Sequence, residues 1–512
     1  MSSAQINFQS GFGEFESDNG SKVVRTSDGG YCVVGATNLN HVDSVDIAVY
    51  FANYLGEMDA SVRIGLSKND FPTGLEQTSD GGFIISGTTY SSPIDLLNSD
   101  IFAIKIDNSG VVEWAYVYGG ADDDEAQSIR KTLEDEYIIV GSTKSFGATA
   151  KSALVLKIDE NGNQIWCNVS SPSVSNHFAQ ADITFDGNYI LGGGSFNGTD
   201  DDNYILKLDT AGTVMWANRF GTTAADWIND IKSTADSGFI IAGISNENTA
   251  GDSDQCVIKL DSTGGITWAY NYGTPYTDRS FSVIQDVQNN YVVCGYTDVD
   301  SLAGVINQLV LEKLDIAGNV LWTNIYGDSS QAYEGYYVTH GIYDGYIALG
   351  YSVAFGDPNG DAFFLKTLDD GISGCDEFQH SLIRNPVTLT WNTGTTAQLV
   401  TLASQSISPV STGFTNSYAQ NCYFDNIIDF KGNTASENFA KVYPNPTTDL
   451  LNIETEFEAE SIDVYDQVGR IVLSFKSNTS IPTIDVSSLK PGIYLLQIFS
   501  KNDFAKARFI KE

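Results

Sequence analysis

Basic residues are scarce in this sequence. Lys and Arg number 27 against 65 Asp and Glu, which gives a formal net charge of −38. A chain of this charge repels polyanions, so nucleic-acid binding is excluded as a function class. Long hydrophobic runs are also missing, whereas a membrane-spanning helix needs about 18 or more apolar residues. We therefore expect no transmembrane segment, and the opening residues, without a basic start or an apolar run, show no export signal.

Histidine and cysteine are sparse as well. The four histidines have no partner at metal-ligand spacing, and no G-x-S-x-G, H-E-x-x-H or D-x-D-x-D-G motif is present. The six cysteines lack C-x-x-C spacing, which argues against a zinc or redox motif. Cys375 and Cys422 flank a segment outside the repeat described next, and the sequence leaves open whether they form a disulfide. No cofactor is expected, apart from loose Ca²⁺ binding by acidic runs such as Asp200 to Asp202.

A unit of about 52 residues recurs along most of the chain. Each unit contains four short strand-like segments, and the second, such as Tyr137 to Val140, is apolar on both faces. A strand of this kind is typical of a sheet covered on both sides by neighbouring sheets. Seven such units bury all their faces when they close into a ring, so the sequence predicts a seven-bladed β-propeller over residues 6–371. The glycine that ends the second segment marks the seven units at Gly35, Gly87, Gly141, Gly193, Gly243, Gly295 and Gly350.

The third segment of five units ends in Lys-x-Asp-x-x-Gly, and a Trp follows four residues later. Lys and Asp two residues apart share one face of a strand, so we expect a structural ion pair between them. The Trp recurs too regularly for a cofactor site, and we expect it to pack between blades. These residues are Trp114, Trp166, Trp216, Trp268 and Trp322.

The two ends of the repeat region predict how the ring closes. The seventh unit has three strands, ending near Asp369, and lacks the Trp and Tyr-Gly that should follow. Phe8 and Phe12-Gly13 have the spacing that Trp114 and Tyr118-Gly119 have in the second unit. We therefore expect Ile6 to Ser10 to form the outer strand of the last blade and to cover its exposed edge.

Residues 372–440 break the repeat. No charged residue occurs from Asn385 to Phe424, where Ser, Thr, Asn and Gln dominate. Two interpretations fit this composition: a spacer with some strand content, or a small added hairpin held by Cys375 and Cys422.

The composition changes again at residue 441. Alternating segments of about five to seven residues, separated by Pro, Asn and Gly, predict a small β-sandwich over residues 441–512. The motifs in this region resemble the C-terminal sorting domain of the type IX secretion system of Gram-negative bacteria. The resemblance implies export by the type IX machinery across the outer membrane, followed by surface attachment or release. The residues that carry it are Tyr443, Pro444, Asn445, Pro446, Gly469, Arg470, Pro491, Gly492 and Tyr494.

One repeat position carries an acid in most units. It lies five residues after each Tyr/Phe-Gly and holds Asp18, Asp70, Asp124, Asn176, Asp226 and Asp278, with Ala332 in the seventh unit. A ring of acids at the mouth of a propeller can hold a cation or a polyhydroxy ligand. The alternative is architecture, in which each carboxylate accepts backbone N–H groups at a turn.

The repeat is broken at the same end of the predicted ring. Aromatic rings beside Asp and Asn suit the faces and hydroxyls of sugars, and loops at one end of a ring form a concave surface. Anchoring of loops is the alternative role for each residue. The candidate ligand-binding residues are His177, Trp227, Arg279, Tyr333, Tyr336, Asp124, Asp226 and Asp278.

These patterns favour a secreted or cell-surface propeller that binds a glycan or a protein, as an adhesion module does, without catalysis. One alternative is an extracellular lyase or glycosidase that uses paired carboxylates on the propeller face. The other is a structural component of a surface assembly.

Overall fold

The structure is a computed structural model, and within its described residues every regular element is a β-strand. No helix in this part of the chain is long and apolar enough to cross a membrane. The chain forms two compact units, residues 6–424 and residues 425–512 with 1–5. The structure describes residues 5–511 apart from 14–17, 39–43, 66–67, 92–93, 95–96, 147, 149, 171–174, 197, 248–252, 302–303, 328–329, 342–344, 355–359, 375–376, 380–381, 388, 394–396, 401–402, 407–409, 414–416, 427–437, 440, 444–446, 455–458, 466–470, 480–481, 491 and 500–503.

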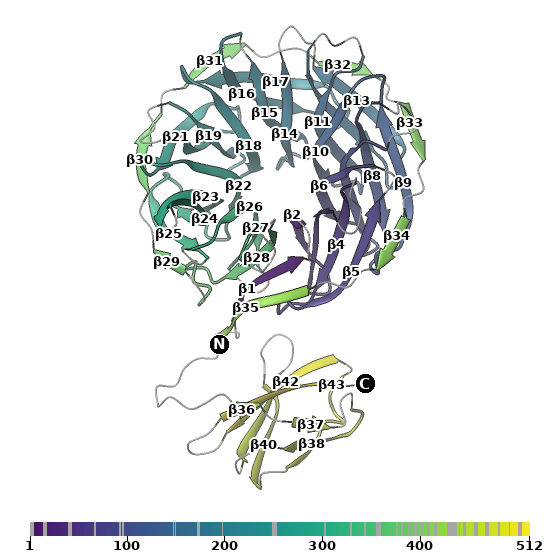
Figure 1. Ribbon diagram of the computed structural model, residues 1–512, viewed down its shortest axis with the longest axis vertical. Helices are drawn as coiled ribbons and strands as arrows, with labels where there is room; N and C mark the ends of the chain where they lie inside the picture. Colours follow the sequence, from purple (N-terminus) through teal and green to yellow (C-terminus); the bar gives the residue numbers. More distant parts are fainter. Residues whose placement is uncertain are drawn as a thin grey trace. The chain divides into compact units, whose positions relative to one another are not determined.

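The larger unit is a ring of seven antiparallel sheets, which confirms the predicted propeller (Figure 1). The innermost strands are β2 (Asp18–Arg25), β6 (Asp70–Gln77), β10 (Asp124–Lys131), β14 (Asn176–Ile183), β18 (Asp226–Ser233), β22 (Asp278–Gln285) and β26 (Tyr333–His340). The second strands are β3 (Tyr31–Thr37), β7 (Phe83–Thr89), β11 (Tyr137–Thr143), β15 (Tyr189–Phe196), β19 (Phe239–Ser245), β23 (Tyr291–Ser301) and β27 (Tyr346–Ser352). The third strands are β4 (Asp46–Ala52), β8 (Asp100–Ile106), β12 (Ser152–Ile158), β16 (Asp201–Leu208), β20 (Asp254–Leu260), β24 (Gly304–Leu314) and β28 (Asp361–Thr367). The fourth strands are β5 (Met58–Gly65), β9 (Val112–Gly119), β13 (Gln164–Ser170), β17 (Val214–Gly221), β21 (Ile266–Gly273), β25 (Val320–Tyr326) and β1 (Gln5–Gly13).

The N-terminal strand closes the ring as the sequence predicts. β1 runs antiparallel to β28, with Phe8 opposite Lys366 and Phe12 opposite Ala362. The Phe8 side chain is 0% exposed, and its ring centroid lies 5.0 Å from that of Phe364. The first strand of the chain is thus a buried part of the last blade.

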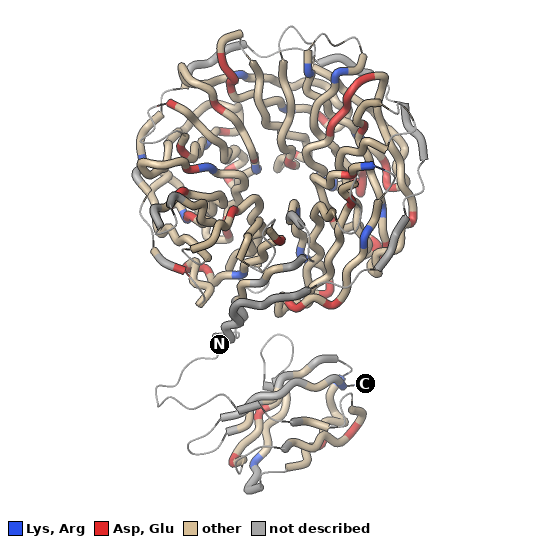
Figure 2. Tube along the Cα trace, viewed as in Figure 1, with Lys and Arg blue, Asp and Glu red and all other residues tan. Residues whose placement is uncertain are grey.

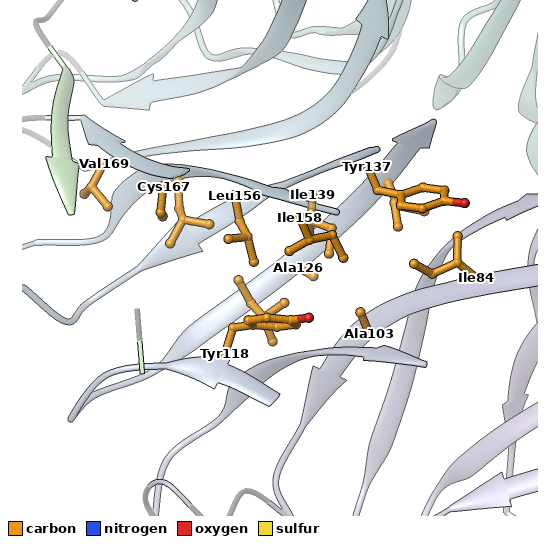
Figure 3. Packing of buried hydrophobic residues seen from close by; sticks show 13 residues of the cluster. Ile84, Ala103, Tyr118, Ala126, Tyr137, Ile139, Leu156, Ile158, Cys167 and Val169 are labelled. Carbon is orange, nitrogen blue, oxygen red and sulfur yellow. The ribbon is translucent and has the colours of Figure 1, made fainter. Parts of the chain in front are cut away.

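The repeated aromatic residues pack between blades, as expected. The ring of Trp166 in the third blade lies 6.3 Å from that of Tyr189 in the fourth. Trp216 and Phe239 repeat this contact at 6.1 Å between the fourth and fifth blades. Figure 3 shows one such boundary, where Tyr118 of the second blade and Leu156 of the third project into a shared apolar layer.

The prediction of an ion pair within each Lys-x-Asp motif is wrong, because the Lys pairs with a different acid. Lys207 binds Asp186, in the turn between the first and second strands, at 2.8 Å. Asp209 instead accepts the backbone N–H groups of its own turn, including that of Thr213 at 2.7 Å, because it lies just past the end of the strand. The same arrangement joins Lys105 to Asp80, Lys259 to Asp236 and Lys313 to Asp286.

The seven strands between Glu377 and Asn426, which we call the belt, pair with the blades rather than with one another. They run once around the rim of the ring and add a fifth strand to each sheet, in the reverse order of the blades, from the sixth to the first and then the seventh (Figure 1). A sheet edge that would otherwise expose unpaired N–H and C=O groups is thereby covered. The belt strands and their partners are β29 (Glu377–Gln379) on β25, β30 (Ile383–Pro386) on β21, β31 (Thr390–Thr393) on β17, β32 (Ala397–Val400) on β13, β33 (Ala403–Ser406) on β9, β34 (Val410–Gly413) on β5 and β35 (Ser417–Asn426) beside β1.

The smaller unit consists of two sheets around an apolar core that includes Leu451, Ile462, Leu496 and Phe509. Gly492 begins one of its strands, and the hydroxyl of Tyr494 donates a hydrogen bond to the carbonyl of Lys490 at 2.9 Å. The first sheet contains β36 (Asn438–Phe439), β43 (Phe504–Lys511), β42 (Gly492–Phe499), β39 (Ala459–Tyr465) and β40 (Ile471–Thr479), and the second contains β37 (Lys441–Tyr443), β38 (Leu450–Glu454) and β41 (Thr483–Asp485). The motif residues Pro444, Asn445, Pro446, Gly469, Arg470 and Pro491 lie outside the described residues.

Candidate functional site

The two ends of the ring differ in how its strands are connected. At one end, which we call the loop end, the innermost and third strands begin and the loops between blades lie. At the opposite end, the hairpin end, tight turns join the first strand to the second and the third to the fourth. The candidate residues from the sequence lie on the innermost strands, in their first four residues and thus toward the loop end.

The repeated acids at the loop end are buried. Asp124, Asp226 and Asp278 are 0–1% exposed. Asp124 accepts the backbone N–H of Gly120 at 2.7 Å, and Asp226 accepts that of Thr222 at 2.6 Å. Both bonds join the start of an innermost strand to the loop that leads into it.

The third of these acids makes the same kind of contact. Asp278 accepts the backbone N–H of Thr274 at 2.6 Å. Burial raises the pKa of Asp124 to about 6, and it also raises the pKa of Asp226 and of Asp278. These contacts favour the architectural role, in which the carboxylates fasten the loops between blades.

A second acid, at the start of the third strand, explains why the fourth strand ends in glycine. The N–H of Asp124 donates to the carbonyl of Ser99, so the start of the third blade lies beside Asp100 of the second. A Cβ atom on Gly119 would lie 1.6 Å from an oxygen of Asp100 and 3.0 Å from one of Asp124. Only glycine leaves room for both carboxylates at this position.

His177 belongs to a charged cluster built by the third, fourth and fifth blades. Burial lowers the pKa of His177, and the nearby charge of Lys151 lowers it further. Lys151 is itself paired with Glu125 at 2.6 Å. The indole N–H of Trp227 donates to Asp201 at 3.3 Å. The structure therefore brings His177 and Trp227 into one polar neighbourhood at the loop end.

Arg279 and Tyr336 belong to a second, aromatic cluster on the sixth and seventh blades. The guanidinium carbon of Arg279 lies 5.9 Å from the ring centroid of Tyr296. The ring of Phe281 packs against Tyr296 at 5.8 Å and edge-on against Tyr336 at 5.5 Å. The Tyr336 hydroxyl donates to Glu334, and burial, the first cause, together with this bond raises the pKa of the phenol.

Tyr333 does not join either cluster. It is 0% exposed, and its ring packs edge-on against Phe363 at 5.0 Å, inside the apolar core between the sixth and seventh blades. A ligand in solution therefore cannot reach this side chain without local opening.

Sequence reasoning missed four exposed aromatic residues at the loop end. Phe71 and Tyr90 are 37% and 40% exposed, and their rings pack edge-on at 6.3 Å. Phe146 and Phe196 are each 39% exposed; Phe196 is the last residue of β15 in the fourth blade, and Phe146 lies three residues after the end of β11 in the third. Phe71 occupies the repeat position of His177 and Trp227, which was a usable signal, but the other three lie where the loops vary in length.

A network of charged residues on the innermost strands was also missed. Figure 2 colours the positions of Lys, Arg, Asp and Glu along the Cα trace. Arg130 of the third blade binds Glu76 of the second at 3.0 Å and Asp182 of the fourth at 3.3 Å. The amine of Lys22 lies 4.4 Å from the ring centroid of Tyr337, and burial lowers its pKa to about 8. The side chains differ in type from blade to blade, so no repeated letter marked this network, which joins neighbouring blades near the axis.

The described residues contain no group of three or more His, Cys, Asp or Glu side chains placed to hold a metal ion. Cys32, Cys167, Cys256 and Cys294 are buried, free thiols, as small apolar core residues would be. Cys375 lies outside the described residues, as does the side chain of Cys422, so the structure does not test the pairing that the sequence left open.

The comparisons with known proteins identify the C-terminal unit. Residues 441–512 match the family model of the secretion system C-terminal sorting domain. No match was found among curated proteins.

The similar solved structures are distant. Sqt1 from Chaetomium thermophilum is 10% identical, with a TM-score of 0.41, over 71% of this chain and 100% of that one. PorZ, an essential bacterial surface component of the type IX secretion system of Porphyromonas gingivalis, is 8% identical, with a TM-score of 0.23, over 99% of this chain and 100% of that one. These likenesses are too weak to bear on function, so the fold rests on the strand pairing itself.

Strand pairing defines the ring, and the family match defines the last unit. Residues 441–512 are a type IX secretion sorting domain, and the chain is a β-propeller protein that this system exports to the outside or the outer surface of a Gram-negative bacterium.

Proposed function

We propose that the propeller is a non-catalytic binding module whose loop end takes a glycan or a protein ligand outside the cell. The observation that carries the proposal is the gathering of aromatic side chains at this end of the ring. Exposed apolar side chains grouped on one face of a soluble scaffold mark interaction sites. The exposed members are Phe71, Tyr90, Phe146 and Phe196, and the partly buried members are Trp227 and Tyr336.

Polar groups beside these rings support a ligand that carries hydroxyl groups. Asp201 lies against Trp227, and Asn307 donates to Glu334 beside Tyr336. Binding sites commonly combine apolar surface with a few placed polar groups that set orientation. A sugar offers both an apolar ring face and hydroxyls, and it matches this combination.

The placement of the repeated acids supports binding without catalysis. A general acid or base must reach its substrate within hydrogen-bonding distance. Asp124, Asp226 and Asp278 are buried and already accept loop N–H groups. An extracellular enzyme would need other carboxylates at the loop end.

A glycan array, followed by titration calorimetry with any hit, tests this proposal. The double variant Phe71→Ala/Tyr90→Ala and the single variant Trp227→Ala should each weaken binding at least tenfold. Phe185→Ala is the matched control, because Phe185 is 75% exposed but lies in a turn at the hairpin end. Equal affinity in all variants would contradict the loop end as the binding face.

A second function, as a structural component of a surface assembly, is favoured by the hairpin end. Leu133, Phe185 and Val287 are 75–82% exposed and occupy equivalent turns of the third, fourth and sixth blades. Large exposed apolar side chains at repeated positions suit a protein contact. Sedimentation of the wild type and of a Leu133→Ser/Phe185→Ser/Val287→Ser variant tests it, since only the wild type should associate.

A further inference from the structure

The boundary between the fifth and sixth blades departs from the repeat inside the core. The residue before the repeated Lys position of the third strand is buried and apolar in six blades. In the sixth blade this residue is Glu312, which is 0% exposed. The six equivalents are Tyr50, Ile104, Leu156, Leu206, Ile258 and Leu365.

Two further polar residues accompany Glu312. Thr323 is its direct partner across β24 and β25, at a position held by Ala115, Cys167, Ala217 and Ala269 in the four preceding blades. Gln255 of the fifth blade is 0% exposed. Its equivalents are Ile47, Ile101, Ala153, Asn203, Leu309 and Ala362.

These three side chains face the same layer. Gln255 pairs across the sheet with Tyr272, which packs in the apolar cluster between the fifth and sixth blades together with Leu314. Glu312 is two residues before Leu314 on one strand, so both lie on the face that meets the fifth blade. After burial, Glu312 is the largest cause of the raised pKa of Tyr272, as expected for close neighbours.

The boundary between the second and third blades shows the ordinary arrangement. There Tyr118, Leu156 and Cys167 occupy the places of Tyr272, Glu312 and Thr323, and they pack into an apolar layer (Figure 3). At the boundary between the fifth and sixth blades, polar residues therefore replace the apolar side chains that fill this layer elsewhere.

The polar atoms at this boundary have no well-formed hydrogen bond among the described residues. This holds for both carboxylate oxygens of Glu312, for the amide oxygen and nitrogen of Gln255 and for the hydroxyl of Thr323. Each unmade hydrogen bond of a buried group lowers stability, and the loss is larger when the group is charged. Burial, with a smaller contribution from the charge of Asp278, raises the pKa of Glu312 to about 8, and the nearby Thr323 hydroxyl only partly opposes this rise. Such a group needs a proton, water or an ion beside it.

We propose that Gln255, Glu312 and Thr323 hold a metal cation between the fifth and sixth blades, and that this cation is Ca²⁺. The carboxylate, the amide carbonyl and the hydroxyl each offer an oxygen atom as ligand, and oxygen is the ligand that Ca²⁺ prefers. Water completes its shell of 6–8 oxygen ligands. Sites with weak affinity, of about 10⁻⁴–10⁻³ M, suffice in extracellular proteins, and this protein is exported.

The ligands come from two blades, so the cation stabilises the closed ring. A ligand that binds only the folded state raises stability with the logarithm of its concentration. The cation would therefore stabilise the ring at this one boundary, in addition to the N-terminal strand and the belt.

Thermal unfolding of the full chain tests the proposal. After treatment with a chelator, the protein is titrated with CaCl₂ at pH 7.5 and constant ionic strength, and tryptophan fluorescence reports unfolding. The unfolding temperature of the wild type should rise by several degrees, and Glu312→Gln should abolish that rise. Glu125→Gln, which removes a partly exposed acid at the loop end, should keep it. The control is needed because a chain with 65 acidic residues can also attract Ca²⁺ weakly and non-specifically.

A repacked variant keeps the test decisive if Glu312→Gln fails to fold. Gln255→Ile/Glu312→Leu/Thr323→Ala restores the apolar residues of other boundaries and should fold, ignore Ca²⁺ and exceed the wild type in stability at pH 9 without Ca²⁺. No Ca²⁺ response in the wild type, or the same response in Glu312→Gln or in the repacked variant, would overturn the proposal. So would a loss of wild-type stability between about pH 5 and pH 8 that added Ca²⁺ does not prevent, because Glu312 would then act as a neutral acid.

Discussion

Truncation of Phe8 tests the closure of the ring by the N-terminal strand. Phe8→Ala removes a fully buried ring whose centroid lies 6.5 Å from that of Tyr31 in the first blade and 5.0 Å from that of Phe364 in the seventh. A Phe-to-Ala change in a packed core costs about 3–5 kcal/mol. Since folded domains are stable by about 5–15 kcal/mol in total, this loss should be large.

Urea unfolding followed by tryptophan fluorescence measures the effect on the ring alone, because all seven Trp residues lie in the propeller and the belt. The midpoint for Phe8→Ala should fall, whereas Leu97→Ala, at a side chain 88% exposed, should change stability by less than about 0.5 kcal/mol. Equal midpoints for the two variants would refute the reasoning, because a strand that closes the ring cannot lose its buried ring without cost.

Three further predictions concern repeated positions. Burial raises the pKa of Asp124 to about 6, so the folded state binds its proton more tightly than the unfolded state, and stability is lost as pH rises from about 4 through 6. Asp124→Asn, which copies Asn176, should remove about 2 kcal/mol of this dependence, as measured by urea midpoints at pH 4 and 7; an unchanged slope would contradict the buried acid. Gly119→Ala should strongly lower the unfolding temperature, since its Cβ would lie 1.6 Å from Asp100; a loss of only a degree would show that the acids are not packed there. Trp166→Ala should cost about 3–5 kcal/mol in urea unfolding, and a value near zero would count against packing between blades.

The ring was predictable from the sequence because the pattern that produces each blade is repeated along the chain. Every second strand is buried on both faces, so each copy shows an apolar run such as Tyr137 to Val140. The closing strand was predictable for the same reason, since Phe8 and Phe12-Gly13 keep the spacing of an outer strand that the seventh unit lacks.

The belt was not predictable in this way. Its strands are three to ten residues long and pair with the blades through backbone groups, which any residue other than Pro supplies in full. Its side chains therefore need no common pattern, and the composition showed only that charge is missing from Asn385 to Phe424. The uncharged Ser and Thr residues are compatible with an edge strand but do not specify one.

The binding end was predictable only in part. His177 and Trp227 stood out because they break the repeat, and the structure places them together at the loop end. Tyr333 stood out equally, but it is core, because a repeat position does not show which way a bulky side chain packs. Tyr90 was missed because it follows the last residue of its strand, where the repeat no longer holds.

Hydrogen exchange, read by mass spectrometry on the full chain, tests the closed and belted ring most directly. Peptides from residues 5–13 and from the belt strands should be protected, as β28 is, because the amides of these strands pair with the outer edges of the blades. Complete exchange of either segment at the first time point, with β28 still protected, would contradict a ring that is closed by its first strand and bound by the belt.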